Sequence, residues 1–210
     1  MRTRVKICGI TRPEEARAAV RAGADAIGLV FHASSPRALE VEQAAEIVAS
    51  LPPFVSAVGL FVDAPAARIE SVLSRVRLDC LQFHGNEAPA ECERFDVPYI
   101  KVARVRAGFD LIQYAVEYRH ARAILVDAYV PGQPGGTGRT FDWGLLPEGL
   151  PLPLILSGGL APDNVARAVR TVHPWAVDVS SGVESAPGRK DPEKVLQFIE
   201  EVRNEDLRHA

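Results

Sequence analysis

Cysteine is scarce in this chain of 210 residues, which has only Cys8, Cys80 and Cys92. Three is an odd number, and none of these cysteines lies close to another in the sequence. They therefore do not form the disulfide framework of a small secreted protein. Unpaired cysteines suit a reducing compartment, and we expect the protein to be cytoplasmic.

Long apolar runs are also lacking, and no stretch of the sequence is long enough to span a bilayer. The amino-terminal segment, residues 1–15, is basic but lacks the apolar stretch of a signal peptide. We therefore expect a soluble protein that is not processed at its amino terminus.

A strong excess of one charge is absent as well. The chain has 24 Lys and Arg against 27 Asp and Glu, which gives a formal net charge of −3 at pH 7. Such a chain does not attract nucleic acid or an anionic membrane as a whole. The sequence also has no basic cluster with interleaved aromatic residues. We expect neither nucleic acid nor a membrane to be a partner.

Apolar residues are plentiful, at 47% of the chain, which is enough for one compact domain with a substantial core. Two full domains would be cramped in this length. No linker or low-complexity segment divides the sequence. We expect one domain over residues 1–203 and a polar, loose tail over residues 204–210.

Eight short runs rich in β-forming residues recur along the chain, and helical stretches separate them. The expected strands are residues 5–8, 26–31, 56–61, 80–83, 99–102, 123–126, 154–156 and 176–179. Three of the segments between them or after them have apolar residues at the i, i+3, i+4, i+7 spacing of a helix, beginning at Ile69, Val165 and Val195. The alternation of strand and helix predicts an α/β fold.

Two helix starts are marked in the sequence. Thr11-Arg-Pro-Glu14 has the pattern of a capping box with proline in the first turn, and Asp191 precedes Pro192. Eight strand–helix units in about 200 residues fit a single-domain (β/α)₈ TIM barrel. A doubly wound open sheet is the alternative, because the number of strands does not prove closure.

Side chains alternate along a strand, so parity tells which residues share a face. We expect the apolar set to pack against the outer helices and the polar set to point into the barrel. The expected inward set is Lys6, Cys8, Gln82, His84, Lys101, Asp127 and Asp178. Charges in an apolar interior are costly unless paired or solvated, and barrel active sites form at the carboxyl ends of the strands. The set indicates an active site, with a paired internal polar network as the alternative.

Two loops rich in Ser and Gly follow the seventh and eighth expected strands, in LILSGGL (154–160) and VDVSSGVE (177–184). Glycine permits close backbone approach, and consecutive N–H groups near a helix start attract a dianion. Barrels commonly bind phosphate after these two strands. One such loop fits an ordinary tight turn equally well, but the pair predicts a phosphorylated substrate.

A third loop, residues 128–143, is rich in Gly and Pro and directly follows Asp127. Its composition and place predict a segment that closes over a ligand and excludes water, with a mobile connection as the alternative. Its PGQPGGTG stretch lacks the lysine and the spacing of a Walker A loop, so an ATPase is not expected.

Together these residues resemble the phosphoribosylanthranilate isomerase family of tryptophan biosynthesis. The matching stretches occur in family order and span nearly the whole chain. They are KICGIT (6–11), SPR (35–37), FHGNE (83–87), VDAYVPGQPGGTGRTFDW (126–143), LSGGLAPDNVARA (156–168) and VDVSSGVESAPGRKD (177–191). Phe83 replaces the leucine more often expected before His84, a change on the outward face that leaves the histidine in place.

The resemblance implies a (β/α)₈ barrel that converts N-(5-phosphoribosyl)anthranilate into 1-(2-carboxyphenylamino)-1-deoxyribulose 5-phosphate by an Amadori rearrangement. It implies no metal and no organic cofactor. The expected partner is this small phosphosugar substrate, and the expected assembly is a monomer or a homodimer.

The resemblance also implies roles for individual residues. By motif match, Cys8 takes the general-base position and Asp127 the general-acid position. Arg37 in SPR matches the arginine that contacts the anthranilate carboxylate. The other matches are the substrate-binding positions His84 and Asp178 and the phosphate-binding residues Gly158, Gly159, Ser181 and Gly182.

A free thiol is mostly protonated at neutral pH, so a general-base cysteine needs a positive neighbour, and Lys6 on the same face is the expected one. Three alternatives remain open at this point. A metal-dependent epimerase would use His84, Asp127 and Asp178 as ligands. A phosphosugar-binding protein would lack turnover, and Cys8 could serve only as a small buried apolar residue.

Overall fold

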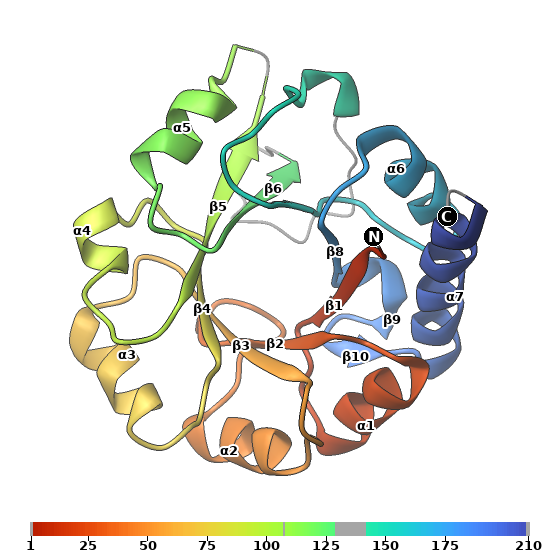
Figure 1. Cartoon of the computed structure of the whole chain (residues 1–210). Coiled ribbons are helices and arrows are strands. Elements are labelled where there is room, and N and C mark those ends of the chain that lie inside the picture. The colour runs from red at the N-terminus through yellow and green to blue at the C-terminus, as the bar shows by residue number, and fades with distance from the viewer. Residues whose placement is uncertain (1, 107, 129–141, 209–210) are drawn as a thin grey trace.

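The eight expected strands form one closed barrel of parallel strands (Figure 1). The structure is a computed structural model that describes residues 2–106, 108–128 and 142–208. The strands are β1 (Arg4–Cys8), β2 (Ala26–Val30), β3 (Ser56–Phe61), β4 (Cys80–Phe83), β5 (Tyr99–Val105), β6 (Ala123–Ala128), β7 (Leu154–Leu156) and β8 (Ala176–Val179). Each strand pairs with the next along the chain, and β8 pairs with β1. The predicted (β/α)₈ barrel is confirmed, and the open-sheet alternative is wrong.

Helices form a ring around the barrel (Figure 1). They are α1 (Pro13–Ala22), α2 (Val41–Ala49), α3 (Ala66–Leu73), α4 (Pro89–Cys92), α5 (Leu111–Glu117), α6 (Val165–Val172) and α7 (Pro192–Arg208). After β8 the chain forms a 3₁₀ turn, η2 (Ser181–Val183), and a small antiparallel hairpin of β9 (Glu184–Ala186) and β10 (Arg189–Lys190). This hairpin is an addition to the eight strand–helix units.

One expected helix is missing between β6 and β7 in the described part of the chain. Residues 142–153 there contain only a 3₁₀ turn, η1 (Trp143–Leu145). Pro147, Pro151 and Pro153 each remove a backbone N–H donor within this segment, so an α-helix cannot run through it.

The two faces of the strands form separate apolar clusters. Outward residues such as Ile7, Leu81 and Ile124 are fully buried between the barrel and the helices, within the main core. Inside the barrel, side chains that include Val102 and Leu125 form a second, smaller cluster. Apolar layers thus fill the barrel floor, and the polar ends of the strands are left at the carboxyl rim, as strand parity predicts.

Lys101 is an exception to the predicted inward set. In the register of β4 and β5 it pairs with Phe83, which packs in the outer core, so Lys101 faces the helices as well. Its fully buried Nζ donates to Glu87 Oε2 at 2.7 Å and to the Gly85 carbonyl oxygen at 2.9 Å. The inward assignment of Lys101 is therefore wrong, because a carboxylate on the helix side stabilises this charge.

Helix α1 begins at Pro13, so the predicted proline in its first turn is confirmed. The predicted capping box is displaced by one residue. Glu15, rather than Glu14, accepts a hydrogen bond from the Thr11 backbone N–H at 2.9 Å. Helix α7 begins at Pro192 after Asp191 as predicted, and Asp191 accepts a hydrogen bond from the Glu193 N–H at 3.0 Å.

The expected loose tail after Arg203 is wrong, because α7 continues to Arg208. Glu205 is fully buried and accepts two hydrogen bonds from Arg170 of α6, at 2.7 and 3.0 Å. Asp206 accepts hydrogen bonds from the Thr3 backbone N–H at 2.6 Å and the Thr3 hydroxyl at 2.8 Å. Glu205 thus attaches the end of α7 to α6, and Asp206 attaches it to the residue just before β1.

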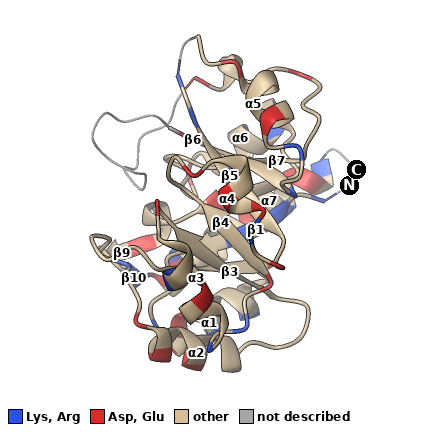
Figure 2. Ribbon diagram, turned by 90° about the vertical axis from the view of Figure 1, so that its left-hand side faces the viewer, with Lys and Arg blue, Asp and Glu red and all other residues tan. Residues whose placement is uncertain are grey.

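Basic and acidic residues are spread over many elements of the molecule rather than collected on one of them (Figure 2). In the part of the chain that the structure describes, no helix is both long enough and apolar enough to cross a membrane.

Candidate active site

A pocket of about 250 Å³ lies at the carboxyl end of the barrel strands. Every predicted site residue except Gly182 lines it. The pocket is bordered by the ends of β1, β4, β6 and β8 and by the loops that follow β2 and β7. Residues from distant parts of the sequence thus meet at one rim because all eight strands run parallel.

Cys8 is the last residue of β1, and its side chain is 5% exposed at the pocket wall. Directly across in β2 lies Gly28, where a Cβ would come within 2.6 Å of the Cys8 Sγ. A glycine at this position therefore leaves room for the thiol. Cys8 also packs against Val30 and Leu60, as the apolar alternative expects, but it keeps access to the pocket.

Beneath Cys8, Lys6 and Asp178 form a buried ion pair between β1 and β8. The two residues are partners in the strand register, and Lys6 Nζ lies 2.8 Å from Asp178 Oδ1. Burial alone would lower the pKa of Lys6, but the nearby Asp178 and Cys8 outweigh it and hold this pKa above its ordinary value. Lys6 is therefore a fixed positive charge.

Burial raises the pKa of the Cys8 thiol above its ordinary value. Lys6 and Lys190 act in the opposite direction, whereas Asp178 adds to the increase. The predicted effect of Lys6 on the thiol thus has the expected sign but does not prevail. Burial therefore favours the protonated thiol of Cys8 over the thiolate.

Asp127 lies near the end of β6, is 5% exposed, and lies next to His84 in the pocket wall. The nearer carboxylate oxygen is 3.5 Å from His84 Nε2. The other ring nitrogen of His84 lies 3.3 Å from the Gln82 side-chain nitrogen. Gln82 and His84 therefore sit on the inner face of β4, as parity predicts, and place an imidazole beside the carboxyl group.

The glycine loops after β7 and β8 lie against each other at the pocket. Gly158 and Gly159 have φ of 86° and 64°, in the left-handed region that favours glycine. Asn164 braces the first loop, since its side chain donates to the Gly159 carbonyl oxygen at 2.9 Å and accepts from the Ala161 N–H at 3.0 Å. The two loops thus present backbone and Ser181 to the pocket.

Gly182 lies just outside the pocket lining and joins these two loops. A Cβ on Gly182 would come within 1.9 Å of the Leu160 carbonyl oxygen. Only glycine allows this close approach of the β8 loop to the β7 loop. The residue therefore shapes the predicted phosphate site through loop packing.

Arg37 lines the pocket from the loop after β2. Its guanidinium donates from Nε to Glu184 Oε1 at 2.7 Å and from Nη2 to Glu184 Oε2 at 2.8 Å. Glu184 Oε1 also accepts a hydrogen bond from Lys190 Nζ at 2.9 Å. The structure thus places the predicted carboxylate-binding arginine at the pocket and within an ion-pair cluster.

Three residues near the site were not identified from the sequence. Glu184 and Lys190 lie inside the matching stretch of residues 177–191, but nothing local marks them as partners of Arg37. Arg104 points inward from the end of β5, in register with Asp127, and donates to the His84 carbonyl oxygen at 2.7 Å. Strand parity missed Arg104, because the expected inward direction of Lys101 puts residue 104 on the outer face of the strand.

The alternative of a metal site finds no geometric support among the described residues, where no group of three His, Cys, Asp or Glu is arranged to hold a metal ion. Asp178 pairs with Lys6 instead of joining His84 and Asp127. The predicted covering loop, residues 128–143, lies largely outside the described residues, so its closure stays a prediction.

A protein-family model described as "N-(5'phosphoribosyl)anthranilate (PRA) isomerase" matches residues 5–201. Similar proteins named N-(5'-phosphoribosyl)anthranilate isomerase come from Azotobacter vinelandii and Pseudomonas fluorescens. The first is 59% identical over 201 residues and covers 96% of this chain and 98% of its own. The second is 58% identical over 200 residues and covers 95% of each chain.

Solved structures agree with these relatives. Phosphoribosyl anthranilate isomerase from Thermotoga maritima has a TM-score of 0.89 and 43% identity, with 96% of this chain and 99% of that chain covered. A phosphoribosyl anthranilate isomerase in complex with reduced 1-(o-carboxyphenylamino)-1-deoxyribulose 5-phosphate has a TM-score of 0.86 and 41% identity over the same shares. A third structure, with a TM-score of 0.85, 40% identity and the same coverage, shows monomers generated from the dimeric Thermotoga maritima enzyme.

Proposed function

Because this chain belongs to the N-(5'-phosphoribosyl)anthranilate isomerase family, we propose that Cys8 and Asp127 carry out the two proton transfers of its reaction. The enzyme catalyses the Amadori rearrangement of N-(5'-phosphoribosyl)anthranilate to 1-(2-carboxyphenylamino)-1-deoxyribulose 5-phosphate in tryptophan biosynthesis. The reaction opens a sugar ring and moves a proton between neighbouring carbons. It therefore needs an acid and a base on the two reacting parts of the sugar.

Asp127 acts as the general acid in this proposal. Ring opening requires a proton on the furanose oxygen while the amine nitrogen lone pair forms the imine. A carboxylic acid at the pocket rim can supply that proton, and Asp127 is held there beside His84. His84, itself fixed next to Gln82, is proposed to orient the carboxyl group and the sugar.

Cys8 acts as the general base. The protonated imine makes the proton on C2 acidic, and a thiolate removes it to give an enolamine that tautomerises to the ketone. The cationic imine adjacent to the sulfur, together with Lys6, favours the thiolate that burial opposes. Asp178, whose Oδ1 lies 2.8 Å from Lys6 Nζ, is proposed to keep Lys6 in place beneath the sulfur.

The substrate has two anionic ends, and we assign each to a different part of the pocket. Backbone N–H groups of Gly158, Gly159, Ser181 and Gly182 are proposed to bind the phosphate, with support from the packing of the two loops at the pocket. Arg37 is proposed to bind the anthranilate carboxylate through N–H groups that Glu184 leaves unused. The sugar then lies between them, next to Cys8 and Asp127.

The observation that carries these assignments is the meeting of Cys8 and Asp127, from the non-neighbouring strands β1 and β6, at one pocket. The experiment is a fluorescence assay of substrate consumption by the parent chain and by the Cys8→Ser and Asp127→Asn variants. Each variant should lose ~10²–10⁴-fold in kcat. Turnover near the parent rate in either variant would remove that residue from its proposed role.

Location and assembly belong to the proposal as well. We place the enzyme in the cytoplasm because all three cysteines are free. The assembly is proposed to be a monomer or a homodimer, given that the related Thermotoga maritima enzyme is dimeric. Light scattering of the purified chain distinguishes the two states.

A further inference from the structure

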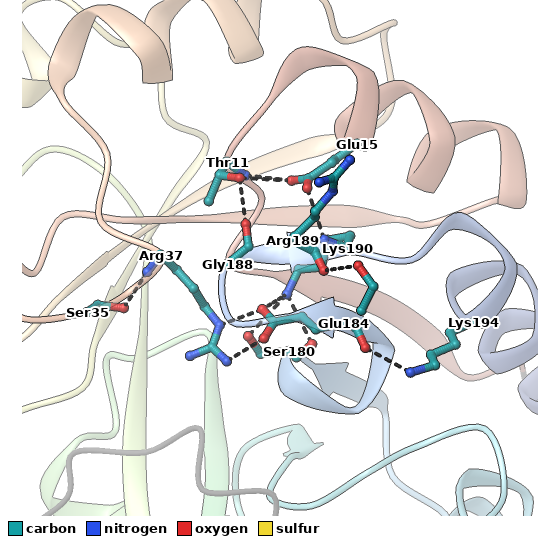
Figure 3. Close-up of polar contacts among 11 residues, drawn as sticks. Thr11, Glu15, Ser35, Arg37, Ser180, Glu184, Gly188, Arg189, Lys190 and Lys194 are labelled. Atoms are coloured by element: carbon teal, nitrogen blue, oxygen red, sulfur yellow. Dashed lines mark hydrogen bonds and ion pairs between the residues drawn. The ribbon is translucent and has the colours of Figure 1, made fainter.

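A cluster of buried charges lies beside the pocket and takes no direct part in the proposed proton transfers. It consists of Arg37, Glu184 and Lys190, which we call the anchor cluster (Figure 3). The side chains of Glu184 and Lys190 are 6% and 2% exposed, and that of Arg37 is 13% exposed. Buried charges are costly to keep unless they are paired, so the cluster has a structural or a functional use.

The Arg37–Glu184 contact fixes the orientation of the guanidinium plane through two hydrogen bonds. One edge of the planar group, Nε and Nη2, binds both carboxylate oxygens at 2.7 and 2.8 Å (Figure 3). A guanidinium has five N–H donors, so three remain for other acceptors. Because Arg37 lines the pocket, these three are the donors that a substrate carboxylate can use.

Lys190 in turn fixes the carboxylate of Glu184. Its Nζ donates to Glu184 Oε1 at 2.9 Å, to the Ser180 carbonyl oxygen at 3.0 Å and to the Ser180 hydroxyl at 3.3 Å. An ammonium group has three N–H donors, and all three are used here. Glu184 therefore stands between two cations, which would otherwise repel each other in a buried place.

The backbone around Arg37 is held by the same hairpin. Gly188, in the turn between β9 and β10, has φ of 75°, and a Cβ there would come within 2.5 Å of the Pro36 carbonyl oxygen. On the other side, a Cβ on Gly9 would come within 2.4 Å of Arg37 Cδ, so the arginine stem lies directly on the residue that follows Cys8. Arg37 is thus packed between the hairpin and the end of β1.

Glu15 connects the hairpin to the Cys8 loop. Its carboxylate accepts hydrogen bonds from the Lys190 backbone N–H at 2.9 Å and from the Thr11 backbone N–H at 2.9 Å. The Thr11 hydroxyl also donates to the Gly188 carbonyl oxygen at 2.9 Å. Glu15 and Thr11 therefore attach both the loop after Cys8 and the hairpin of the anchor cluster to the start of α1.

We propose that Glu184 and Lys190 are positioning residues, which hold the Arg37 guanidinium edge-on so that its remaining N–H groups bind the carboxylate of the substrate. The inference rests on the proposed role of Arg37 in binding that carboxylate. Glu184 orients the plane of the guanidinium, and Lys190 orients Glu184 and offsets its charge. Carboxylate recognition therefore depends on a glutamate that does not touch the substrate.

The test compares two inhibitors on the intact chain. One is reduced 1-(o-carboxyphenylamino)-1-deoxyribulose 5-phosphate, and the other is the same compound without its carboxyl group. We divide the inhibition constant of the compound without the carboxyl group by that of the complete compound. This ratio is large when the enzyme recognises the carboxylate and approaches one when it does not. Glu184→Gln should reduce this ratio ~10-fold or more and leave the inhibition constant of the second compound unchanged, because only a charge-assisted contact is lost.

Four further variants, one of them Arg37→Ala, complete the test. Lys190→Gln, which keeps both Arg37–Glu184 hydrogen bonds possible, should reduce the ratio less, and it carries the test alone if Glu184→Gln fails to fold. In the double variant Arg37→Ala/Glu184→Gln the ratio should fall no further than in Arg37→Ala, because the two residues act through one contact. Glu193→Gln, an exposed glutamate at the start of α7, is the matched control and should keep the ratio of the parent.

Three results would overturn the proposal. If Glu184→Gln weakens both inhibitors equally, the anchor cluster has only a structural role. If Arg37→Ala abolishes the ratio but Glu184→Gln and Lys190→Gln keep it, Arg37 needs no positioning. A ratio that survives Arg37→Ala would instead contradict the proposed role of Arg37 itself, and the positioning inference would fail with it.

Discussion

Cys8 depends on the residues that surround its sulfur as much as on its own chemistry. Gly28 gives the thiol its room, and Lys6 and Asp178 set the charge beneath it. These neighbours come from β1, β2 and β8, which only barrel closure brings together. The surroundings of the proposed base are therefore built by residues from three strands.

Replacing Gly28 with alanine tests this dependence. The added Cβ would lie 2.6 Å from Cys8 Sγ, 3.0 Å from Cys8 Cα and 3.1 Å from Lys6 Nζ, so the sulfur has to move. We expect kcat to fall by ~10-fold or more, because small displacements of a catalytic group are costly. Steady-state assays of substrate fluorescence measure the change.

Gly59→Ala is the matched control for that variant. Gly59 lies in the neighbouring strand β3 and would meet Leu78 Cδ1 at 2.4 Å, on the helix side of the sheet. This control should lose stability by about 1–3 kcal/mol from overpacking but keep its kcat. Equal kcat losses in both glycine variants would contradict a local effect on Cys8.

Lys6→Met tests the charge beneath the sulfur. Lys6 lowers the pKa of Cys8, and Asp178 raises it, so removing the lysine takes away one influence and leaves the other unpaired. The pKa of Cys8 should therefore rise further above its ordinary value. Since the thiolate is the active form, the limb of the kcat/KM profile that increases with pH should shift to higher pH, with the largest loss of activity near neutrality.

The matched control for Lys6→Met is Arg17→Met, which removes an exposed positive charge on α1. It should leave the pH profile in place. A Lys6→Met profile that coincides with that of the parent would show that the lysine does not tune the thiol.

At the scale of elements, strand parity separated packing residues from site residues on β1, β4, β6 and β8. Each of those strands has apolar residues at alternate positions, so the polar residues between them had to face inward. On β5 the same reasoning was wrong for Lys101, whose partner Glu87 lies 14 residues away and on the helix side. No local sequence pattern predicts such a partner, and only the register of β4 with β5 shows that Lys101 faces the helices.

The carboxyl-terminal end of α7 gives a second case in which composition misled. Residues after Arg203 are polar, which predicts a loose tail, yet Glu205 and Asp206 bind Arg170 and Thr3. A charged residue can be buried if its partner is supplied by another element. The last turns of α7 therefore attach to both α6 and the start of β1.

Deleting residues 204–210 tests this attachment. The truncated chain loses charge-assisted hydrogen bonds to Arg170 and Thr3, each worth about 1.5–3 kcal/mol. We expect a clearly lower melting temperature and a kcat like that of the parent below the transition, because these contacts lie away from the pocket. A melting temperature equal to that of the parent would show that the end of α7 is dispensable.

At the scale of the whole molecule, the two ends of the barrel have different roles: one is filled by apolar side chains, and the other holds the proposed active site. Apolar layers such as Val102 and Leu125 close the floor, while the carboxyl rim gathers the charges, the glycine loops and the proposed acid and base. The sequence predicted this division, since eight strands with polar ends imply one rim. It could not predict the anchor cluster, because Arg37, Glu184 and Lys190 are far apart in the chain or unmarked by any local pattern.

The central claim is that Cys8 removes the proton from C2 and Asp127 protonates the ring oxygen. The most direct measurement is the kinetic isotope effect on kcat with substrate deuterated at C2, for the parent, Cys8→Ser and Asp127→Asn. Both variants should be ~10²–10⁴-fold slower. Cys8→Ser should show a large primary isotope effect, because C–H cleavage becomes limiting, whereas Asp127→Asn should show almost none, because ring opening limits it. Isotope effects of equal size in the two variants, or an effect confined to Asp127→Asn, would contradict the assignment.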